Sequence, residues 1–163
     1  MNWNGQTVFL TGASSGIGEG IALALAEKGA VLGLLARRKE LLEKIRTQCE
    51  EVGGTASIYV CDVTDADAVA ASVDDFLHEF EHIDFLIANA GIGGNNAETR
   101  AMQPLAVKKV IDINLMGAVN SVHAVLPSML SRGSGHIVAV SSLAGFRGLP
   151  RSAAYSASKA GMT

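Results

Sequence analysis

Thr7-Val8-Phe9-Leu10-Thr11-Gly12-Ala13-Ser14-Ser15-Gly16-Ile17-Gly18 is the stretch that decides the fold. Its first five residues form a short apolar run typical of a buried strand, and a glycine-rich turn follows at once. The segment from about Ile17 to Lys28 then has helical spacing, with Gly29 as its stop. Backbone N–H groups and the positive end of a helix dipole meet at such a turn, where they favour an anion. The stretch therefore predicts a strand, a phosphate-binding turn and a helix.

The three glycines of the turn each have an expected purpose. Gly12 would allow the tight turn, Gly16 would let a pyrophosphate approach the backbone, and Gly18 would let helix and strand pack closely. Their spacing is Gly-x-x-x-Gly-x-Gly, which differs from the commoner Gly-x-Gly-x-x-Gly. A glycine-rich turn without a ligand is the alternative, but the strand-turn-helix context favours a dinucleotide site.

Apolar runs alternate with longer helical patterns along all 163 residues. Further strands are expected at 30–36, 55–61, 83–88 and 136–141, and further helices at 40–51, from 64 to about 80, and from 104 to about 130. This alternation is typical of βαβ units and a parallel sheet, and no linker or repeat marks a second domain. We expect one α/β domain over residues 1–163, with a Rossmann-like, doubly wound parallel sheet and helices on both faces.

Several local features of the helices can also be predicted. Thr64 and Asp67 resemble a capping box at a helix start, and Pro127 should kink or loosen the last turn of the long helix. Asn114 lies inside that helix, although asparagine offers the backbone a competing hydrogen bond. His78 and His82 should share a helix face and could in principle bind a metal. No third ligand is evident, so we expect this face to be solvated. We therefore predict no metal site.

The end of the second strand bears on the choice of dinucleotide. An acidic residue about 20 residues after the glycine turn would bind the ribose 2′-hydroxyl of NAD. This chain has Arg37 and Arg38 there instead. Two guanidinium groups suit a 2′-phosphate, so the sequence favours NADP, with NAD as the alternative. Solvated surface arginines are the other interpretation.

Tyr155 and Lys159 form the strongest candidate for chemistry. If residues 153–159 open a helix, these two side chains lie on one face, one turn apart. The ammonium would favour the phenolate form of the tyrosine, which could then exchange a proton with a substrate oxygen. Ser142, on the preceding loop, could donate a hydrogen bond to the same oxygen. A Tyr-x-x-x-Lys pair is common on helix surfaces, so the glycine turn is what gives this pair its weight.

Together these motifs resemble the short-chain dehydrogenase/reductase family in its compact branch. The residues that carry the resemblance are Thr11–Gly18, Asp62, Asn89-Ala90-Gly91, Asn114, Ser142 and Tyr155-x-x-x-Lys159. The resemblance implies a Rossmann-like fold, NAD(P) as cofactor, and reduction of a carbonyl to a secondary alcohol or the reverse. With the two arginines, it makes an NADPH-dependent oxidoreductase the leading prediction. A non-catalytic dinucleotide-binding scaffold or sensor is the alternative.

The resemblance also assigns catalytic roles. Tyr155 would be the proton donor or acceptor, and Lys159 would assist it and bind the nicotinamide ribose. Ser142 would orient the substrate oxygen, and Asn114 would hold a water in a proton relay at a local kink of its helix. Ser141 competes for the serine role, because successive strand residues point to opposite faces. The family spacing to the tyrosine favours Ser142.

The predicted cofactor-binding residues follow the carboxyl ends of the strands or lie on the tyrosine helix. They are Gly12, Ser14, Ser15, Gly16, Ile17, Gly18, Arg37, Arg38, Asp62, Val63, Asn89, Ala90, Gly91, Tyr155 and Lys159. By the resemblance, Asp62 and Val63 should meet the adenine, and Asn89-Ala90-Gly91 should pass beneath the adjoining ribose. Ordinary turn chemistry at the strand ends is the alternative for both. Leu143, Phe146 and Asn95 are expected at the rim of a substrate pocket, and the loop 91–99 is a candidate lip.

Composition excludes several classes of function. The formal net charge of −3 provides no basic field for nucleic acid. No uninterrupted apolar run reaches the ~18 residues of a membrane span. Two cysteines make no disulfide framework, so we expect a cytoplasmic protein. The family implies a small-molecule carbonyl or alcohol substrate and a homodimer or homotetramer. Its members are typically longer, so we expect this chain to be truncated within the helix that carries Tyr155 and Lys159.

Overall fold

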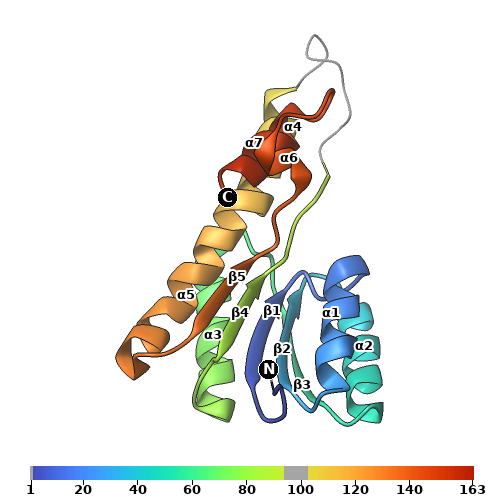
Figure 1. The fold of residues 1–163 in the computed structure, drawn as a ribbon, viewed down its shortest axis with the longest axis vertical. Helices are drawn as coiled ribbons and strands as arrows, with labels where there is room; N and C mark the ends of the chain where they lie inside the picture. Colours follow the sequence, from blue (N-terminus) through green and yellow to red (C-terminus); the bar gives the residue numbers. More distant parts are fainter. Residues whose placement is uncertain (1, 94–102) are drawn as a thin grey trace.

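In the computed structural model, which describes residues 2–93 and 103–163, five parallel strands form one sheet in the order β3-β2-β1-β4-β5 (Figure 1). The strands are β1 (Thr7–Thr11), β2 (Val31–Ala36), β3 (Thr55–Val60), β4 (Phe85–Ala88) and β5 (His136–Ala139). The predicted Rossmann-like parallel sheet is therefore confirmed. β5 is shorter than expected because it ends where its partner β4 ends, with Ala139 beside Ala88.

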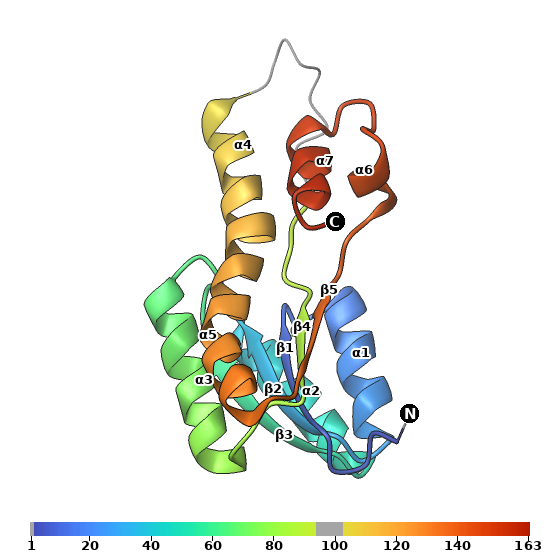
Figure 2. The ribbon, with the colours of Figure 1, turned by 60° about the vertical axis from the view of Figure 1, so that its left-hand side comes forward.

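Helices cover both faces of this sheet. α1 (Gly16–Ala26) and α2 (Lys39–Glu51) lie on one side, and α3 (Ala66–Phe80) and α5 (Gly117–Arg132) lie on the other (Figures 1 and 2). Because neighbouring strand residues point in opposite directions, the strands supply two separate cores. Val8, Leu10 and Leu32 pack toward α1 and α2, whereas Phe9, Leu35 and Leu86 pack toward α3 and α5. The sheet thus holds both layers of helices in fixed positions around its carboxyl edge.

The long helix is continuous but irregular. It consists of α4 (Pro104–Ile111), the π-helical turn η2 (Asp112–Met116) and α5. The helix runs through Pro127 to Arg132 and ends at Gly133, whose φ of 70° caps it. The helix therefore continues past Pro127, where an irregularity was expected. The irregularity comes at η2, around Asn114, where the family resemblance implies a kink.

The same helix contains no uninterrupted apolar run of the ~18 residues that a membrane span needs, but it is apolar on average. Pro104–Arg132 is 29 residues long and contains an 18-residue window of mean hydropathy 1.2, so by length and composition it could cross a membrane. Within the domain, its residues Val125 and Met129 are fully or nearly buried in the core beneath α3. A core helix covered on one face can pass the same test, and 33% of this window is buried, so by itself the helix is weak evidence for a membrane span.

Two local predictions are wrong. Asp65, rather than Thr64, caps α3, because its carboxylate accepts a hydrogen bond from the N–H of Ala68 at 3.0 Å. The hydroxyl of Thr64 is instead bound to Asp62, at 2.9 Å. His82 lies beyond the end of α3, with its Nε2 3.4 Å from Asp84, so it does not share a helix face with His78.

Two short helices stand beyond the carboxyl edge of the sheet. α6 (Leu143–Phe146) was not predicted, and α7 (Ala153–Ala160) is the expected helix of Tyr155 and Lys159. Figure 2 shows α7 beside the first half of the long helix and α6 on the other side of α7. All four residues of the edge strand β5, which precedes α6, are exposed.

Candidate active site

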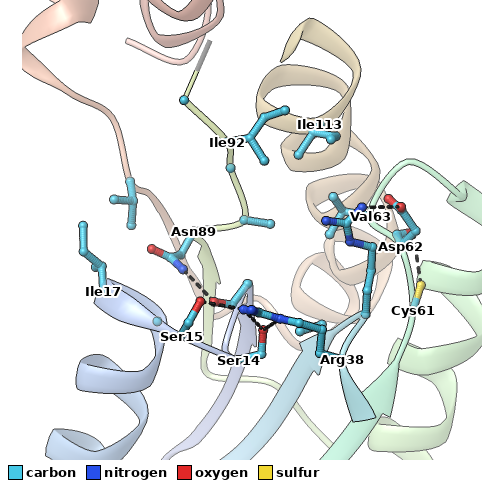
Figure 3. Close-up of a pocket in the computed structure, with 18 of the residues that line it drawn as sticks. Ser14, Ser15, Ile17, Arg38, Cys61, Asp62, Val63, Asn89, Ile92 and Ile113 are labelled. Atoms are coloured by element: carbon cyan, nitrogen blue, oxygen red, sulfur yellow. Dashed lines mark hydrogen bonds and ion pairs between the residues drawn. The ribbon is translucent and has the colours of Figure 1, made fainter. Parts of the chain in front are cut away.

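A pocket of ≈ 550 Å³ lies at the carboxyl edge of the sheet, which is where ligands bind in open α/β sheets. Figure 3 shows residues that line it, from the glycine turn to Ile113. All but one of the predicted cofactor-binding residues line this pocket, the exception among them being Gly16. Of the predicted catalytic residues, Tyr155 and Lys159 line it, whereas Ser142 and Asn114 do not.

The glycine turn is shaped by close backbone contacts. Gly12 has a φ of 70°, and a Cβ there would lie 2.7 Å from the Cα of Ala90. A Cβ on Gly18 would overlap the carbonyl oxygen of Gly12. Gly16 has a φ of 59° with open space beside it. The turn thus packs tightly against Ala90 at Gly12, and it is open at Gly16. The open side suits a diphosphate that approaches the backbone N–H groups.

The Asn89-Ala90-Gly91 turn is fixed directly to the glycine turn. The side-chain amide of Asn89 donates to the carbonyl oxygens of Thr11 and Gly12 at 3.1 and 3.3 Å. The hydroxyl of Thr11 accepts hydrogen bonds from the backbone N–H groups of Asn89 and Ala90, both at 3.2 Å. Asn89 therefore holds the floor of the pocket together, a role that the sequence did not assign to it.

The two arginines occupy different positions. The guanidinium of Arg38 donates to the hydroxyls of Ser14 and Ser15, at 2.9 and 2.7 Å, so it lies directly beside the glycine turn (Figure 3). Arg37 lies 3.5 Å from a carboxylate oxygen of Asp62, and both groups are exposed to solvent. The positive charge of Arg38 therefore lies directly beside the anion-binding turn.

Asp62 is held in its charged form by its neighbours. Burial alone would raise the pKa of its carboxyl, but hydrogen bonds from the backbone and hydroxyl of Thr64, together with Arg37, bring the pKa below its usual value. An ionised carboxylate thus lies at the end of β3, next to Val63. A charged group at this position can accept hydrogen bonds from an amino group on a bound base.

Tyr155 and Lys159 lie side by side in α7, as the helical spacing predicted. The ammonium nitrogen is 5.9 Å from the centre of the tyrosine ring. Lys159 is 4% exposed, and its ammonium donates to the carbonyl oxygen of Val140 at 2.6 Å. Burial lowers the pKa of Lys159. The buried ammonium is thus within the range of an electrostatic attraction to the tyrosine ring.

The two serines before α6 point in different directions. The hydroxyl of Ser141 donates to the carbonyl oxygen of Lys159 at 3.2 Å and also contacts Thr163. Ser142 caps α6, and its hydroxyl oxygen accepts from the N–H of Ala144 at 3.2 Å. Ser141 contributes to the pocket wall through its place beside Val140. The hydroxyl hydrogen of Ser142 has no bond among the described residues, so this serine can still donate.

Asn114 is completely buried in η2. Its side-chain oxygen accepts from the N–H of Ile92 at 2.7 Å, and its amide donates to the Ile92 carbonyl at 3.0 Å and to Ser158 at 3.0 Å. The side chain of Asn114 thus bonds to the loop after β4 and to α7. π-helical turns frequently mark functional sites.

The pocket wall also contains residues that were not predicted to bind the cofactor. They are Ala36, Cys61, Ile92, Gly93, Ile113, Val140 and Ser141. Ala36, Cys61 and Val140 lie at or just beyond the carboxyl ends of β2, β3 and β5, so the rule that strand ends line the crevice would have found them. In Figure 3, Ile92 and Ile113 lie above Ser14 and Arg38. Asn95 lies outside the described residues, as does most of the loop 91–99.

Neither a metal centre nor a disulfide is present among residues 2–93 and 103–163. No group of three or more potential metal ligands occurs in this part of the chain. Cys49 and Cys61 are both buried and free, and burial raises the pKa of each thiol, that of Cys49 to about 11.

Comparisons with known proteins agree with this geometry. The family model described as short chain dehydrogenase matches residues 6–163. An uncharacterized oxidoreductase of Myxococcus xanthus is 44% identical over 155 residues, which cover 95% of this chain and 61% of that protein. A fatty acyl-CoA reductase of Acinetobacter baylyi is 38% identical, with 99% of this chain and 55% of that protein covered.

Solved structures show the same fold. The NAD+-bound xylitol dehydrogenase superposes with a TM-score of 0.96 and 39% identity, and a metagenomic short-chain oxidoreductase in complex with NADP does so with 0.93 and 36%. These comparisons cover 99% of this chain, and 62% and 73% of the two known chains. The chain spans about three fifths of the length of the first curated relatives, between 61% and 64%. It belongs to the short-chain dehydrogenase family.

Proposed function

We propose that the protein is an NADP-dependent oxidoreductase that reduces a carbonyl to a secondary alcohol or catalyses the reverse reaction. One observation carries this proposal. A single pocket joins the glycine turn to Tyr155 and the buried Lys159. A dinucleotide site and an acid–base pair therefore share one cavity, and solved relatives of this fold contain NAD or NADP.

The residues of the pocket fit a nicotinamide dinucleotide. The open side of Gly16 and the N–H groups at the start of α1 would hold the diphosphate. Asp62 and Val63 would meet the adenine, and Asn89-Ala90-Gly91 would lie beneath a ribose. When bound, the nicotinamide ring would donate or accept the hydride.

In the proposed reaction the protein supplies the proton and the orientation. During reduction, the hydroxyl of Tyr155 gives its proton to the substrate oxygen, and the ammonium of Lys159 stabilises the phenolate that remains. Ser142 donates a hydrogen bond to the same oxygen and so fixes the carbonyl in place. Oxidation of the alcohol reverses each step, with the phenolate as the base.

The preference for NADP depends on Arg38. Its guanidinium lies against the hydroxyls of Ser14 and Ser15, where a phosphate could be bound by all three groups. Arg37 is 59% exposed and already paired with Asp62. We therefore assign the 2′-phosphate chiefly to Arg38, with Arg37 contributing a longer-range attraction.

The test is oxidation of NADPH with a panel of ketones, followed by the variant Tyr155→Phe. Loss of the phenolic hydroxyl should reduce kcat by roughly 10²-fold to 10⁴-fold, which is the usual contribution of general acid–base catalysis. Tyr59→Phe is the matched control, because Tyr59 packs against Phe9 in the core rather than facing the pocket. This control should keep the parental rate.

Two results would contradict the proposal. Unchanged turnover in Tyr155→Phe would exclude the proton-transfer role of that residue. Tight NADPH binding without turnover of any ketone or alcohol would instead favour a dinucleotide-binding scaffold or sensor.

We further propose that the protein acts as a cytoplasmic homo-oligomer, and that the long helix forms the contact. Its outer surface exposes five large apolar side chains, which are Leu105, Met116, Val119, Leu126 and Leu130. Apolar residues that line one helix face in this way favour association with another protein surface. Light scattering of the purified protein tests the oligomeric state.

A further inference from the structure

Ser158 is a buried side chain that the proposed function does not use. It is 0% exposed and lies between Tyr155 and the long helix. Its hydroxyl donates to the carbonyl oxygen of Tyr155 at 2.8 Å and accepts from the side-chain amide of Asn114 at 3.0 Å. The hydroxyl of Ser158 thus donates one hydrogen bond within α7 and accepts one from η2.

These two bonds complete a chain of contacts across three segments. Asn114 in η2 is bound to both backbone groups of Ile92, which lines the pocket. Ser158 then connects the same amide to the backbone of α7. The loop after β4, the π-helical turn and the tyrosine helix are therefore joined through two side chains, Asn114 and Ser158, both 0% exposed.

We propose that Ser158 is a positioning residue for the reaction, because its hydroxyl holds α7 against η2 and so keeps Tyr155 and Lys159 directed into the pocket. The inference rests on the proposed function. Three features support it. Ser158 binds the carbonyl group of Tyr155 itself, it is adjacent to Lys159 in the chain, and it is the side chain of α7 that Asn114 binds.

The chain provides a matched control on the same helix. Ser156 is also buried, at 8% exposure, but its hydroxyl accepts from the N–H of Leu149, in the segment before α7. Replacing Ser156 therefore removes a buried hydroxyl from α7 without touching the connection to η2. Any difference between Ser158→Ala and Ser156→Ala reports that connection.

The experiment measures kcat, the pH dependence of kcat and the dissociation constant for NADPH in the parent and both variants. Ser158→Ala should lower kcat roughly 10-fold to 100-fold, because small displacements of catalytic groups have effects of that size. The pH dependence of kcat should also differ from that of the parent, because Tyr155 and Lys159 are no longer held in the same relative position. NADPH binding should remain near the parental value, and Ser156→Ala should resemble the parent.

Two further variants keep the test decisive if Ser158→Ala does not fold. Ser158→Thr retains a hydroxyl, whereas Ser158→Cys retains the size but bonds weakly. The proposal requires the threonine variant to retain more activity than the cysteine variant. The opposite order would show that volume, rather than hydrogen bonding, decides the effect, and it would overturn the proposal.

The outcomes also separate this inference from the proposed function. If the parent turns over ketones and Tyr155→Phe does not, parental kcat and pH dependence in Ser158→Ala refute the positioning role alone. If the parent is inactive, the proposed function fails, and the connection is tested by NMR. Slow exchange of the Asn114 side-chain amide protons in the parent and faster exchange in Ser158→Ala would support the connection, and equal exchange would overturn it.

Discussion

Lys159 is buried, and a buried charge is tolerated only when other polar groups replace the hydration that it loses. The carbonyl of Val140, one residue beyond the end of β5, supplies a hydrogen bond at 2.6 Å. The face of the Tyr155 ring supplies a weaker attraction. The point where β5 ends thus fixes both a pocket wall and the orientation of a cation.

A first prediction at the scale of single residues concerns the arginines. Arg38→Ala should weaken NADPH binding roughly 10-fold or more, because charge-assisted hydrogen bonds contribute about 1.5–3 kcal/mol. Its affinity for NADH, which lacks the phosphate, should change little. Titration of both nucleotides by protein fluorescence measures the two effects.

Arg37→Ala is the companion variant. Because Arg37 is exposed and paired with Asp62, its replacement should weaken NADPH binding less than the replacement of Arg38. A larger loss in Arg37→Ala would contradict the assignment of the phosphate to Arg38, and equal losses for NADPH and NADH would remove the phosphate argument altogether.

A second prediction concerns Asp84, the residue immediately before β4. Its carboxylate accepts two hydrogen bonds from Arg132 at 2.9 Å and two from Thr7 at 3.0 and 3.1 Å. Burial alone would raise the pKa of Asp84, but the bonds from Thr7 and Arg132, with the nearby His82, bring it below its usual value. Asp84→Asn should lower the free energy of unfolding at pH 7 by about 2 kcal/mol.

The sign of the pH dependence follows from that depressed pKa. The carboxylate stabilises the folded state fully above its unfolded pKa near 3.9, and the benefit disappears as pH falls through the folded value. The difference between parent and Asp84→Asn in urea titrations should therefore shrink below pH 3.9. Asp74→Asn, at an exposed position of α3, should show no such difference, and a constant difference for Asp84→Asn at all pH values would contradict the explanation.

At the scale of elements, the first turn of α5 packs unusually closely on the loop that holds the expected adenine site. A Cβ on Gly117 would lie 2.6 Å from a methyl group of Val63, and the amide of Asn120 donates to the carbonyl of Val63 at 2.9 Å. The long helix therefore determines the position of Asp62 and Val63.

A third prediction follows from this contact. Gly117→Ala should destabilise the fold by about 1–3 kcal/mol, because an added methyl group in a packed core forces its neighbours apart. It should also weaken NADPH binding by displacing Val63. Gly20→Ala is the control, since a Cβ at Gly20 in α1 meets nothing within 4 Å. That variant should gain about 0.5–1 kcal/mol from the better helix former, and urea titration distinguishes the two signs.

Elements were predictable from sequence where their causes are local. The glycine turn follows β1 at a fixed spacing, and Tyr155 and Lys159 are one turn apart in any helix. By contrast, the hydrogen bonds of Asn114 go to Ile92 and Ser158, 22 and 44 residues away. The contact between Arg38 and the glycine-turn serines likewise depends on β2 lying beside β1. No periodic pattern encodes such contacts, so the sequence could indicate the candidate residues but not their connections.

At the scale of the whole molecule, the long helix leaves large apolar side chains exposed on its outer side. The long helix buries Ser121, Val125 and Met129 on its inner side, while Val119 and Leu130 remain exposed on its outer side. The inner side secures the domain, and the outer side is the surface that we assign to pairing.

A fourth prediction tests that assignment. Val119→Glu should shift the protein toward the monomer in light scattering, because a charge in an apolar contact must be desolvated. Val52→Glu is the control, since Val52 is exposed to a similar extent, 43% against 48%, but lies at the end of α2. If Val119→Glu keeps the parental assembly, the contact between subunits does not involve this side of the long helix.

The π-helical turn has a consequence for the phase of the long helix. A π-turn contains one more residue than the α-turn it replaces, and each helical residue advances the side chains by about 100°. Deleting one residue from Asp112–Met116 would restore regular hydrogen bonding but rotate one half of the helix against the other. The half that meets α7 and the half that packs beneath α3 could then no longer face their partners together. The extra residue of the π-turn therefore sets the rotation between α4 and α5, so that α4 can pack on α7 while α5 packs on α3.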